Sequence, residues 1–246
     1  MNPDINSPLT ASTVSCYDSH ARDYDLYQFA VVPGYRDMLD LVASACRRHL
    51  PDDARILDLG CGTGNASLAI LQQLPSAHIF LLDGSPRMVE IAACKLEQAH
   101  PGSISGRRVA DLSGEGWQKG LAEEGGFDAI VSTLVLEHLP FSAYRAAIAG
   151  CLSLLLPGGW LFAAEGYSHE GSDMQEWFYS LMEERRQAVE PQISEFVARL
   201  REEETHYYTG MDQKEQWWRE AGYEGVAVLW QYLCIALMAG KRPGSV

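Results

Sequence analysis

The stretch Ala54–Ser85 reads ARILDLGCGTGNASLAILQQLPSAHIFLLDGS and decides the fold of this chain. It begins with a short apolar run at 56–59, which predicts a buried parallel strand. A glycine loop at Gly60–Gly64 and a helical pattern follow, and a second apolar run at 79–82 ends on Asp83. Strand, glycine loop, helix and strand make one βαβ unit, and a ligand is expected above its strand ends.

The spacing between an acid and the glycines indicates the chemistry of that ligand. Gly60, Gly62 and Gly64 form a G-x-G-x-G pattern, and Asp58 lies shortly before the first of them. The NAD fingerprint is G-x-G-x-x-G instead, and a carboxylate at Asp58 would repel the pyrophosphate of a dinucleotide. S-adenosylmethionine carries an ammonium that this acid could attract and a carboxylate that loop N–H groups could bind. Asp83, at the end of the second strand, can accept hydrogen bonds from both ribose hydroxyls, so the pattern favours S-adenosylmethionine over NAD.

The motif LDLGCGTG at residues 57–64 resembles motif I of the class I S-adenosylmethionine-dependent methyltransferases of the small-molecule type. The resemblance covers about residues 17–242 and is strongest over 54–165. It implies a Rossmann-like α/β fold with a central, mostly parallel seven-stranded sheet, a terminal antiparallel hairpin and a helical lid. It also implies transfer of the methyl group of S-adenosyl-L-methionine, which leaves S-adenosyl-L-homocysteine.

Residues after the second and third predicted strands are expected to complete the cofactor site: Gly84, Ser85, Met88, Asp111 and Leu112. The thioether of Met88 could lie against the adenine ring, with plain core packing as the competing explanation. The resemblance implies that Asp111 accepts from the adenine amino group and that the Leu112 N–H reaches a ring nitrogen. The alternative for Asp111 is a helix cap.

A Y-D-x-x-A-x-x-Y-D pattern at 17–25 precedes the first strand. The resemblance implies that this segment folds over the cofactor, with the hydroxyl of Tyr24 reaching the methionine carboxylate. The alternative is that Tyr17 and Tyr24 only pack a helix onto the domain.

The fourth predicted strand, 127–133, leads to the expected place of chemistry. Ligands lie outside the carboxyl ends of parallel strands at the switch in strand order, so Ser132–His138 should border the transferable methyl group, with Ser132 in the cofactor set. Methyl transfer needs alignment and exclusion of water, and an oxygen or nitrogen nucleophile can also need a base with a pKa near 7, as histidine provides. His138 is the best-placed candidate base and His206 the second, with catalysis by proximity alone as the alternative.

Residues 166–210 are expected to form a helical insertion after the fifth strand, 160–164. Its bulky apolar residues require cover, either as a lid over an aromatic pocket or as a dimer contact. The lid is favoured, because water must be kept from the acceptor. The candidate substrate residues are Tyr17, Glu137, Glu165, Tyr167, Trp177, Tyr207 and Tyr208.

The whole chain is expected to be a single methyltransferase domain. Its parts are an N-terminal cap at 1–50, a core at 51–165 and 211–246, and the lid at 166–210. A short helix is expected around Trp117 and Leu121.

Composition points to a small-molecule acceptor and away from nucleic acid and membrane partners. The chain has 33 acidic and 19 basic residues and a net charge of −14, which repels phosphate backbones and anionic membranes. The six cysteines are scattered, without a C-x-x-C pair, and no histidines have metal-ligand spacing, so we expect reduced thiols in a cytoplasmic protein and no metal site. The polar start of the chain does not have the pattern of a signal peptide.

Two alternatives to a small-molecule methyltransferase of the O-, N- or C-type remain open. The layout after residue 165 and the WQY hairpin at 230–232 also resemble carboxy-S-adenosylmethionine synthase. The arginine that binds the carboxylate in that family would lie before the last helix, where this chain has His206–Gly210 and no arginine. The second alternative is a non-catalytic protein that binds S-adenosylmethionine.

Overall fold

The computed structural model describes residues 23–114, 116–121, 125–168, 173–203 and 205–244, and the side chains within these ranges except those of 199–203. Seven strands form one sheet in the order β3-β2-β1-β4-β5-β7-β6. Five neighbouring strands run parallel, while β7 runs antiparallel to both β5 and β6. The strands are β1 (Arg55–Leu59), β2 (His78–Asp83), β3 (Ile104–Val109), β4 (Phe127–Thr133), β5 (Leu155–Gly166), β6 (Glu224–Tyr232) and β7 (Ile235–Lys241). The predicted Rossmann-like sheet with a terminal antiparallel hairpin is confirmed.

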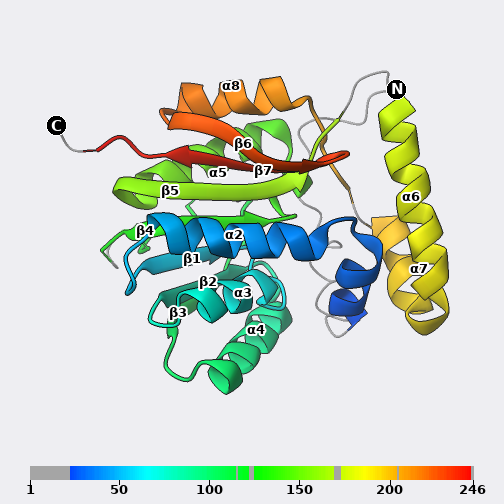
Figure 1. Ribbon diagram of the computed structural model, residues 1–246, viewed down its shortest axis with the longest axis horizontal. Helices are drawn as coiled ribbons and strands as arrows, with labels where there is room; N and C mark the ends of the chain where they lie inside the picture. Colours follow the sequence, from blue (N-terminus) through cyan, green and yellow to red (C-terminus); the bar gives the residue numbers. More distant parts are fainter. Residues whose placement is uncertain (1–22, 115, 122–124, 169–172, 204, 245–246) are drawn as a thin grey trace.

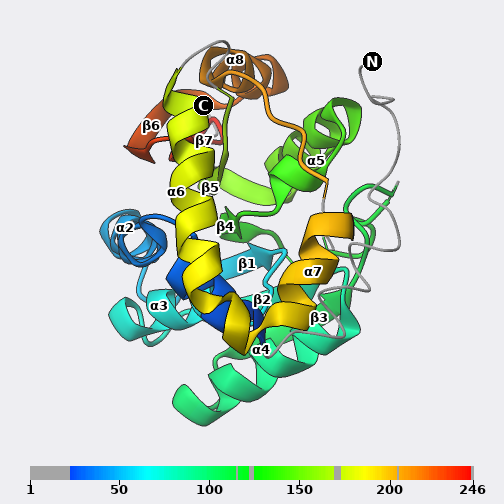
Figure 2. The same ribbon diagram turned by 90° about the vertical axis from the view of Figure 1, so that its right-hand side faces the viewer.

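Helices cover both faces of the sheet, which explains why its central strands are continuously apolar. In β1, Ile56 packs into the core under α2, α3 and α4, whereas Leu57 and Leu59 pack on the opposite face under α5 and α8. Figure 2 shows α2 and α3 on one side of the strands and α5 on the other. The helices of the two layers are α2 (Tyr35–His49), α3 (Asn65–Gln73), α4 (Pro86–Ala99), α5 (Phe141–Leu154) and α8 (Met211–Ala221).

Two helices, α6 (Asp173–Val189) and α7 (Ser194–Glu203), stand apart from these layers, with the 3₁₀ turn Glu190–Gln192 between them. They follow β5 and lie beyond the carboxyl ends of the parallel strands (Figure 1), and Figure 2 shows them crossing in front of the sheet. A helix over residues 23–31 packs against this pair. The rings of Tyr27 and Phe196 meet edge to face at 5.5 Å in this contact. The N-terminal cap and the insertion therefore share one small apolar core.

The structure corrects two expectations about local elements. Residues 117–121 form turns rather than a helix, because Gly116 and Gly120 adopt φ values of +82° that a right-handed helix excludes. The side chains of Trp117 and Leu121 are nevertheless buried in the core. Strand β5 is longer than the expected 160–164. It begins at Leu155, before a shift in its register against β4, and it pairs with β7 up to Gly166.

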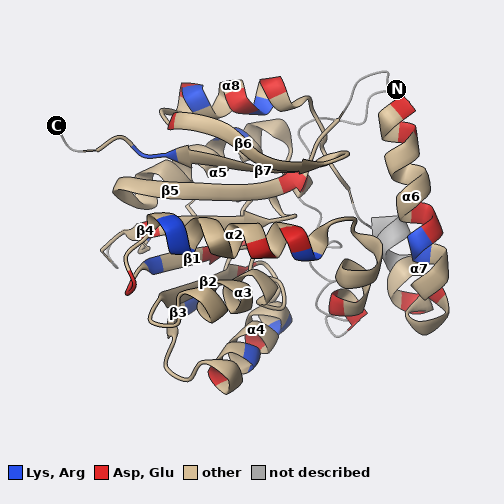
Figure 3. Cartoon of the chain, in the orientation of Figure 1, with Lys and Arg blue, Asp and Glu red and all other residues tan. Residues whose placement is uncertain are grey.

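Charged side chains are mixed over the outer helices. Figure 3 shows basic residues interspersed with acidic ones on α2, α4 and α8. Among the described residues, no helix is long and apolar enough to cross a membrane.

Candidate functional site

A pocket lies above the carboxyl ends of the first strands, where the strand order reverses between β1 and β4. This cofactor pocket brings together nine residues that the sequence predicted for cofactor binding. They are Tyr24, Gly60, Gly62, Asp83, Gly84, Ser85, Met88, Asp111 and Leu112. Ala110, Leu134, Val135 and His138 complete its lining.

The glycine loop is shaped by close approach to the segment after β4. Gly60 has a φ of +74°, and a Cβ there would lie 2.9 Å from the Cβ of Val135 and still closer to its γ carbons. The N–H groups of Gly60 and Cys61 donate to the carbonyl of Leu82 at 2.7 and 2.9 Å. A side chain at Gly60 would therefore push the loop off its neighbours, which explains why the loop needs glycine here.

Asp83 is held in place by the backbone on both sides of the pocket. Its Oδ2 accepts from the Gly62 N–H at 2.9 Å and its Oδ1 from the Ser85 N–H at 2.8 Å. Ser85 in turn caps α4 by accepting from the Met88 N–H at 3.2 Å. Burial raises the pKa of Asp83 above its ordinary value. A carboxylate has about four lone-pair sites, so acceptor capacity for a ribose hydroxyl remains beside the backbone donors Gly62, Gly84 and Ser85.

Asp58 lies behind the glycine loop rather than in the lining of the pocket. It is 1% exposed, and its Oδ2 accepts from the hydroxyl of Ser67 on α3. Its Oδ1 is buried with no hydrogen-bond partner among the described residues, and burial raises its pKa to about 6. An unpartnered buried carboxylate oxygen fits a ligand that brings an ammonium, as S-adenosylmethionine does.

Gly64 and Ser132 shape the site without lining it. The Gly64 N–H closes the loop by donating to the Cys61 carbonyl at 2.8 Å. The Ser132 hydroxyl donates to the Leu59 carbonyl at 3.0 Å and so ties β4 to β1. Both residues belong to the architecture of the site, which differs from the direct contact that the sequence predicted.

Asp25 fastens the N-terminal helix to the glycine loop, and sequence reasoning assigned it no role. Its carboxylate accepts from the Thr63 hydroxyl, from Asn65 Nδ2 at 2.8 Å and from Lys95 Nζ at 2.9 Å. This anchor places the ring of Tyr24 against Gly62, about 3.5 Å from where a Cβ would be. The second Y-D pair of the 17–25 pattern was the available signal. Tyr17, the first tyrosine of that pattern, lies outside the described residues.

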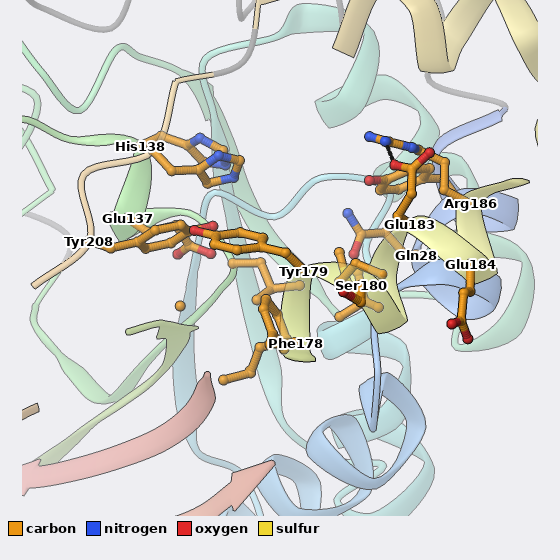
Figure 4. Close-up of a pocket in the computed structure, with 17 residues that line it drawn as sticks. Gln28, Glu137, His138, Phe178, Tyr179, Ser180, Glu183, Glu184, Arg186 and Tyr208 are labelled. Atoms are coloured by element: carbon orange, nitrogen blue, oxygen red, sulfur yellow. Dashed lines mark ion pairs between the residues drawn. The ribbon is translucent and has the colours of Figure 1, made fainter. Parts of the chain in front are cut away.

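A second, larger cavity of about 980 Å³ lies beside the cofactor pocket and under α6. Figure 4 shows this cavity, called the acceptor cavity because an acceptor is expected there, with Glu137, His138 and Tyr208 on one side and α6 residues on the other. Leu134 and His138 line both cavities and form their common wall. The other lining residues are Tyr27, Gln28, Val32, Glu137, Gly166, Phe178, Tyr179, Ser180, Met182, Glu183, Glu184, Arg186, His206, Tyr208 and Ile235.

The common wall has an unusual backbone. Leu134 adopts a φ of +57°, and its N–H donates to the Ala164 carbonyl at 2.7 Å. A positive φ is strained for a bulky residue, and such strain gathers where surrounding structure imposes it at functional sites. This conformation of Leu134 turns the chain from β4 into the buried 3₁₀ turn Leu136–His138.

The two candidate histidines are brought together at this wall. Their ring centroids lie 4.6 Å apart, and the ring of His206 stacks on Tyr208 at 5.1 Å. The Nδ1 atom of His138 lies 3.1 Å from the carbonyl oxygen of Thr205. Because a carbonyl only accepts, Nδ1 carries the proton, and Nε2 of the neutral ring is an acceptor.

Four predicted substrate residues lie outside the lining of the acceptor cavity. Glu165 is fully buried, where it pairs with Lys214 of α8 and accepts from the Tyr144 hydroxyl at 2.9 Å. Its neighbour Tyr167 is also buried, 4.7 Å from Lys214 Nζ. The fifth strand was expected to end at residue 164, but β5 continues inside the sheet to Gly166, and Glu165 therefore lies in the core.

The other two of these four residues lie on surfaces turned away from the cavity. Trp177 is 57% exposed, whereas its neighbour Phe178 is buried and lines the cavity. Tyr207 packs edge to face on Phe141 at 6.3 Å, and its N–H donates to the Glu137 carbonyl at 2.7 Å. Neighbouring residues face different ways, so Phe178 lines the cavity in place of the predicted Trp177, and Tyr208 of the predicted pair Tyr207 and Tyr208 lines it while Tyr207 does not.

No group of three or more metal-ligating side chains is found among the described residues. Four of the described cysteines, Cys46, Cys61, Cys151 and Cys234, are buried. Burial raises the pKa of the Cys46 thiol to about 12. The site thus consists of hydrogen-bonding, ionisable and aromatic side chains.

Known proteins resemble this chain most clearly over its core. A family model described as "Methyltransferase domain" matches residues 57–161. The ubiquinone biosynthesis O-methyltransferase of Xanthomonas campestris pv. campestris is 38% identical over 125 residues, which are 50% of this chain and 46% of that protein. The chain thus spans about half the length of this relative.

Two further comparisons cover more of the chain. The carboxy-S-adenosyl-L-methionine synthase of Chromohalobacter salexigens is 28% identical over 216 residues, 86% of this chain and 77% of that protein. The 1,6-didemethyltoxoflavin-N1-methyltransferase of Burkholderia thailandensis, solved with its substrate and S-adenosylhomocysteine, superposes with a TM-score of 0.64 at 14% identity. That superposition covers 99% of this chain and 93% of the other, and at such identity it shows the fold alone.

The sheet order, the glycine loop with Asp83, the unpartnered Asp58 oxygen and the matched domain model agree with one another. S-adenosylmethionine is the cofactor that this set of residues fits. Residues 57–161 thus match a methyltransferase domain, and they lie on the fold of the class I S-adenosylmethionine-dependent methyltransferases.

Proposed function

We propose that this chain methylates a small organic molecule, with S-adenosylmethionine in the cofactor pocket and the acceptor in the cavity under α6. The observation that carries the proposal is that the two cavities share Leu134 and His138 as a common wall. In-line displacement requires donor and acceptor to meet across a short gap, and a shared wall is where two bound molecules can meet.

Each half of the site has a distinct task. When bound, S-adenosylmethionine supplies a methyl group activated by a sulfonium charge. Asp83 holds the ribose, Asp58 attracts the ammonium from behind the loop, and Tyr24 closes the loop from above. His138 carries its proton on Nδ1, beside the Thr205 carbonyl, so its Nε2 can receive a proton that an oxygen or nitrogen nucleophile loses.

Helix α6 excludes water from the acceptor. Phe178 and Met182 line the cavity from this helix, and Met182 also packs against the core shared with Tyr27. A dry cavity strengthens the polar contacts that align the acceptor. The lid function of 166–210 is thus part of the proposal, and the dimer contact is its alternative.

Entry of the cofactor requires the N-terminal helix and the insertion to move. The cofactor pocket measures about 80 Å³, whereas sites for drug-sized ligands have roughly 300 Å³ or more. Tyr24 lies on Gly62, and the helix that carries it packs on α7 through Tyr27 and Phe196. We therefore expect the N-terminal helix and the insertion to open together.

Calorimetry with S-adenosylhomocysteine tests the cofactor half of the proposal. Asp83→Asn keeps the size of the side chain but loses the charge, so affinity should fall by roughly 10- to 100-fold, the worth of hydrogen bonds to a charged group. Asp52→Asn is the matched control, because Asp52 is exposed and pairs only with Arg47 in a surface ion pair. Tight binding of NAD with none of the adenosyl ligand would contradict the proposal.

The acceptor half is tested by incubating the chain and S-adenosylmethionine with a metabolite library and detecting methylated products by mass spectrometry. Appearance of S-adenosylhomocysteine together with one methylated compound supports it. Saturable S-adenosylhomocysteine binding with no product from any acceptor would favour a non-catalytic binding protein.

A second candidate function is modification of the cofactor itself. The relative that favours it is the carboxy-S-adenosyl-L-methionine synthase, whose similarity extends over 86% of this chain. Against it, no Arg or Lys lines the cofactor pocket among the described residues to pair with an added carboxylate. A cofactor that gains the mass of a carboxyl group in the same incubation would establish this function.

A further inference from the structure

Glu137 is a buried acid that the proposed transfer does not require. It is 3% exposed and lines the acceptor cavity, one residue before the common wall at His138. Its Oε2 is buried with no hydrogen-bond partner among the described residues. Leaving such a group unpaired destabilises a protein, so an acid in this position is unusual unless a ligand pairs with it.

The charges around Glu137 leave it without a cation of its own. His138 lies beside it on the same 3₁₀ turn, Glu165 and Tyr167 face it from the end of β5, and Lys214 faces it from α8. Lys214 is already in a buried ion pair with Glu165 and also donates to the Gly166 carbonyl at 3.3 Å. Burial, opposed in part by His138, raises the pKa of Glu137 to about 7.

The rest of the cavity is acidic and aromatic. Glu183 and Glu184 line it from α6, and the one guanidinium in the described lining, that of Arg186, is paired with Glu183. Figure 4 shows this pair across the cavity from Glu137 and Tyr208. The ring of Tyr208 is stacked on His206 at 5.1 Å. Carboxylates together with aromatic faces attract organic cations, through ion pairing and through cation–π contacts.

Resting on the proposed methyl transfer, we propose that the acceptor carries a basic nitrogen on an aromatic or apolar body and that Glu137 binds this nitrogen as an ammonium. The aromatic side chains contact the body of the acceptor, and the carboxylate of Glu137 receives its N–H. Glu137 thus selects the substrate class, whichever atom of the acceptor takes the methyl group. An anionic acceptor is excluded by the same acids.

Three probes of matched shape and different charge test this selection by calorimetry in the presence of S-adenosylhomocysteine. Tyramine is a cation, 4-ethylphenol is neutral and 3-(4-hydroxyphenyl)propionate is an anion. Tyramine should bind at least about tenfold more tightly than 4-ethylphenol, in keeping with a charged hydrogen bond, and the anion most weakly. Equal affinities, a reversed order or no saturable binding of tyramine would overturn the proposal.

Two variants locate the selection at Glu137. Glu137→Gln should weaken tyramine at least about tenfold and leave 4-ethylphenol and S-adenosylhomocysteine unchanged. Glu176→Gln is the matched control, because Glu176 lies on α6 but is exposed and is not part of the cavity lining, and it should change tyramine affinity less than about threefold. If Glu137→Gln does not fold, Glu137→Asp replaces it, and the charge order of the three probes on the unaltered chain still decides.

The pH dependence supplies an independent readout. Because the neutral acid attracts no ammonium, tyramine affinity should rise between about pH 6 and pH 8, while tyramine itself stays charged, and should be flat in Glu137→Gln. A flat profile in the unaltered chain counts against Glu137. If S-adenosylhomocysteine fails to bind, the proposed function fails; if it binds and the probes show no charge preference, only this inference fails.

Discussion

Gly60→Ala perturbs the glycine loop at its tightest point, and the structure supplies its own control. The φ of Gly60 is +74° and that of Gly102 is +80°, so an alanine meets the same left-handed backbone at both positions. Around Gly102 no atom lies within 4 Å of the added Cβ, whereas at Gly60 it would meet Val135 at 2.9 Å or less. The difference between the two variants therefore isolates the contact with Val135.

The expected magnitudes follow from these two geometries. The left-handed conformation costs an alanine roughly 1–2 kcal/mol at either site. Overpacking against a buried neighbour adds typically 1–3 kcal/mol at Gly60 alone. Gly102→Ala should then destabilise by about 1–2 kcal/mol and Gly60→Ala by about 2–5 kcal/mol.

Urea denaturation of both variants measures these values, and S-adenosylhomocysteine calorimetry adds the functional consequence. Affinity should fall in Gly60→Ala, because the loop N–H groups and the Gly62–Asp83 contact shift together, and should be unchanged in Gly102→Ala. Equal destabilisation by the two substitutions would refute the argument that Val135 shapes the loop. A normal affinity in Gly60→Ala would refute the assignment of this loop to the cofactor.

Three further predictions concern the acceptor side and the partners. His138→Asn should remove a pH dependence of turnover near neutrality and spare S-adenosylhomocysteine affinity; an unaltered pH–rate profile would make His138 structural. Tyr208→Ala should raise the KM of an acceptor found in the library, because Tyr208 lines the cavity, and Tyr207→Phe should leave that KM unchanged, because Tyr207 does not. If Tyr208→Ala instead abolishes dimerisation in sedimentation and keeps full kinetics, the insertion is an interface. From the net charge of −14, no binding of tRNA or duplex DNA is expected at physiological salt, and a gel shift that persists at that salt would contradict this.

The cofactor half of the site could be predicted because its signals are local. The glycine loop and Asp83 lie within one βαβ unit of about thirty residues, where spacing along the chain largely fixes spacing in space. The strand ends at Asp111 and Leu112 follow from the same topology, and both residues line the pocket. Residues that only support this half, such as Asp58 behind the loop, carry the same sequence signal as residues that line it.

The acceptor half depends on contacts between distant segments, which a single sequence does not reveal. Glu165 was predicted as a substrate residue, and its buried pairing with Lys214 could not be foreseen because Lys214 is 49 positions away in the sequence. On α6 the sequence predicted Trp177 as a substrate residue, whereas Phe178 lines the cavity, since a polar surface helix with apolar residues at neighbouring positions has no single apolar stripe. The positive φ of Leu134, which turns the chain at the common wall, has no residue-type signal at all.

The proposed methyl transfer depends on the common wall that Leu134 and His138 form between the two cavities. A crystal structure with S-adenosylhomocysteine tests this arrangement. We expect the ribose hydroxyls on Asp83, the amino group on the side of Asp58 and the sulfur against the wall of Leu134 and His138, facing the cavity under α6. A ligand whose sulfur points away from that wall, or one bound outside the glycine loop, would contradict the account.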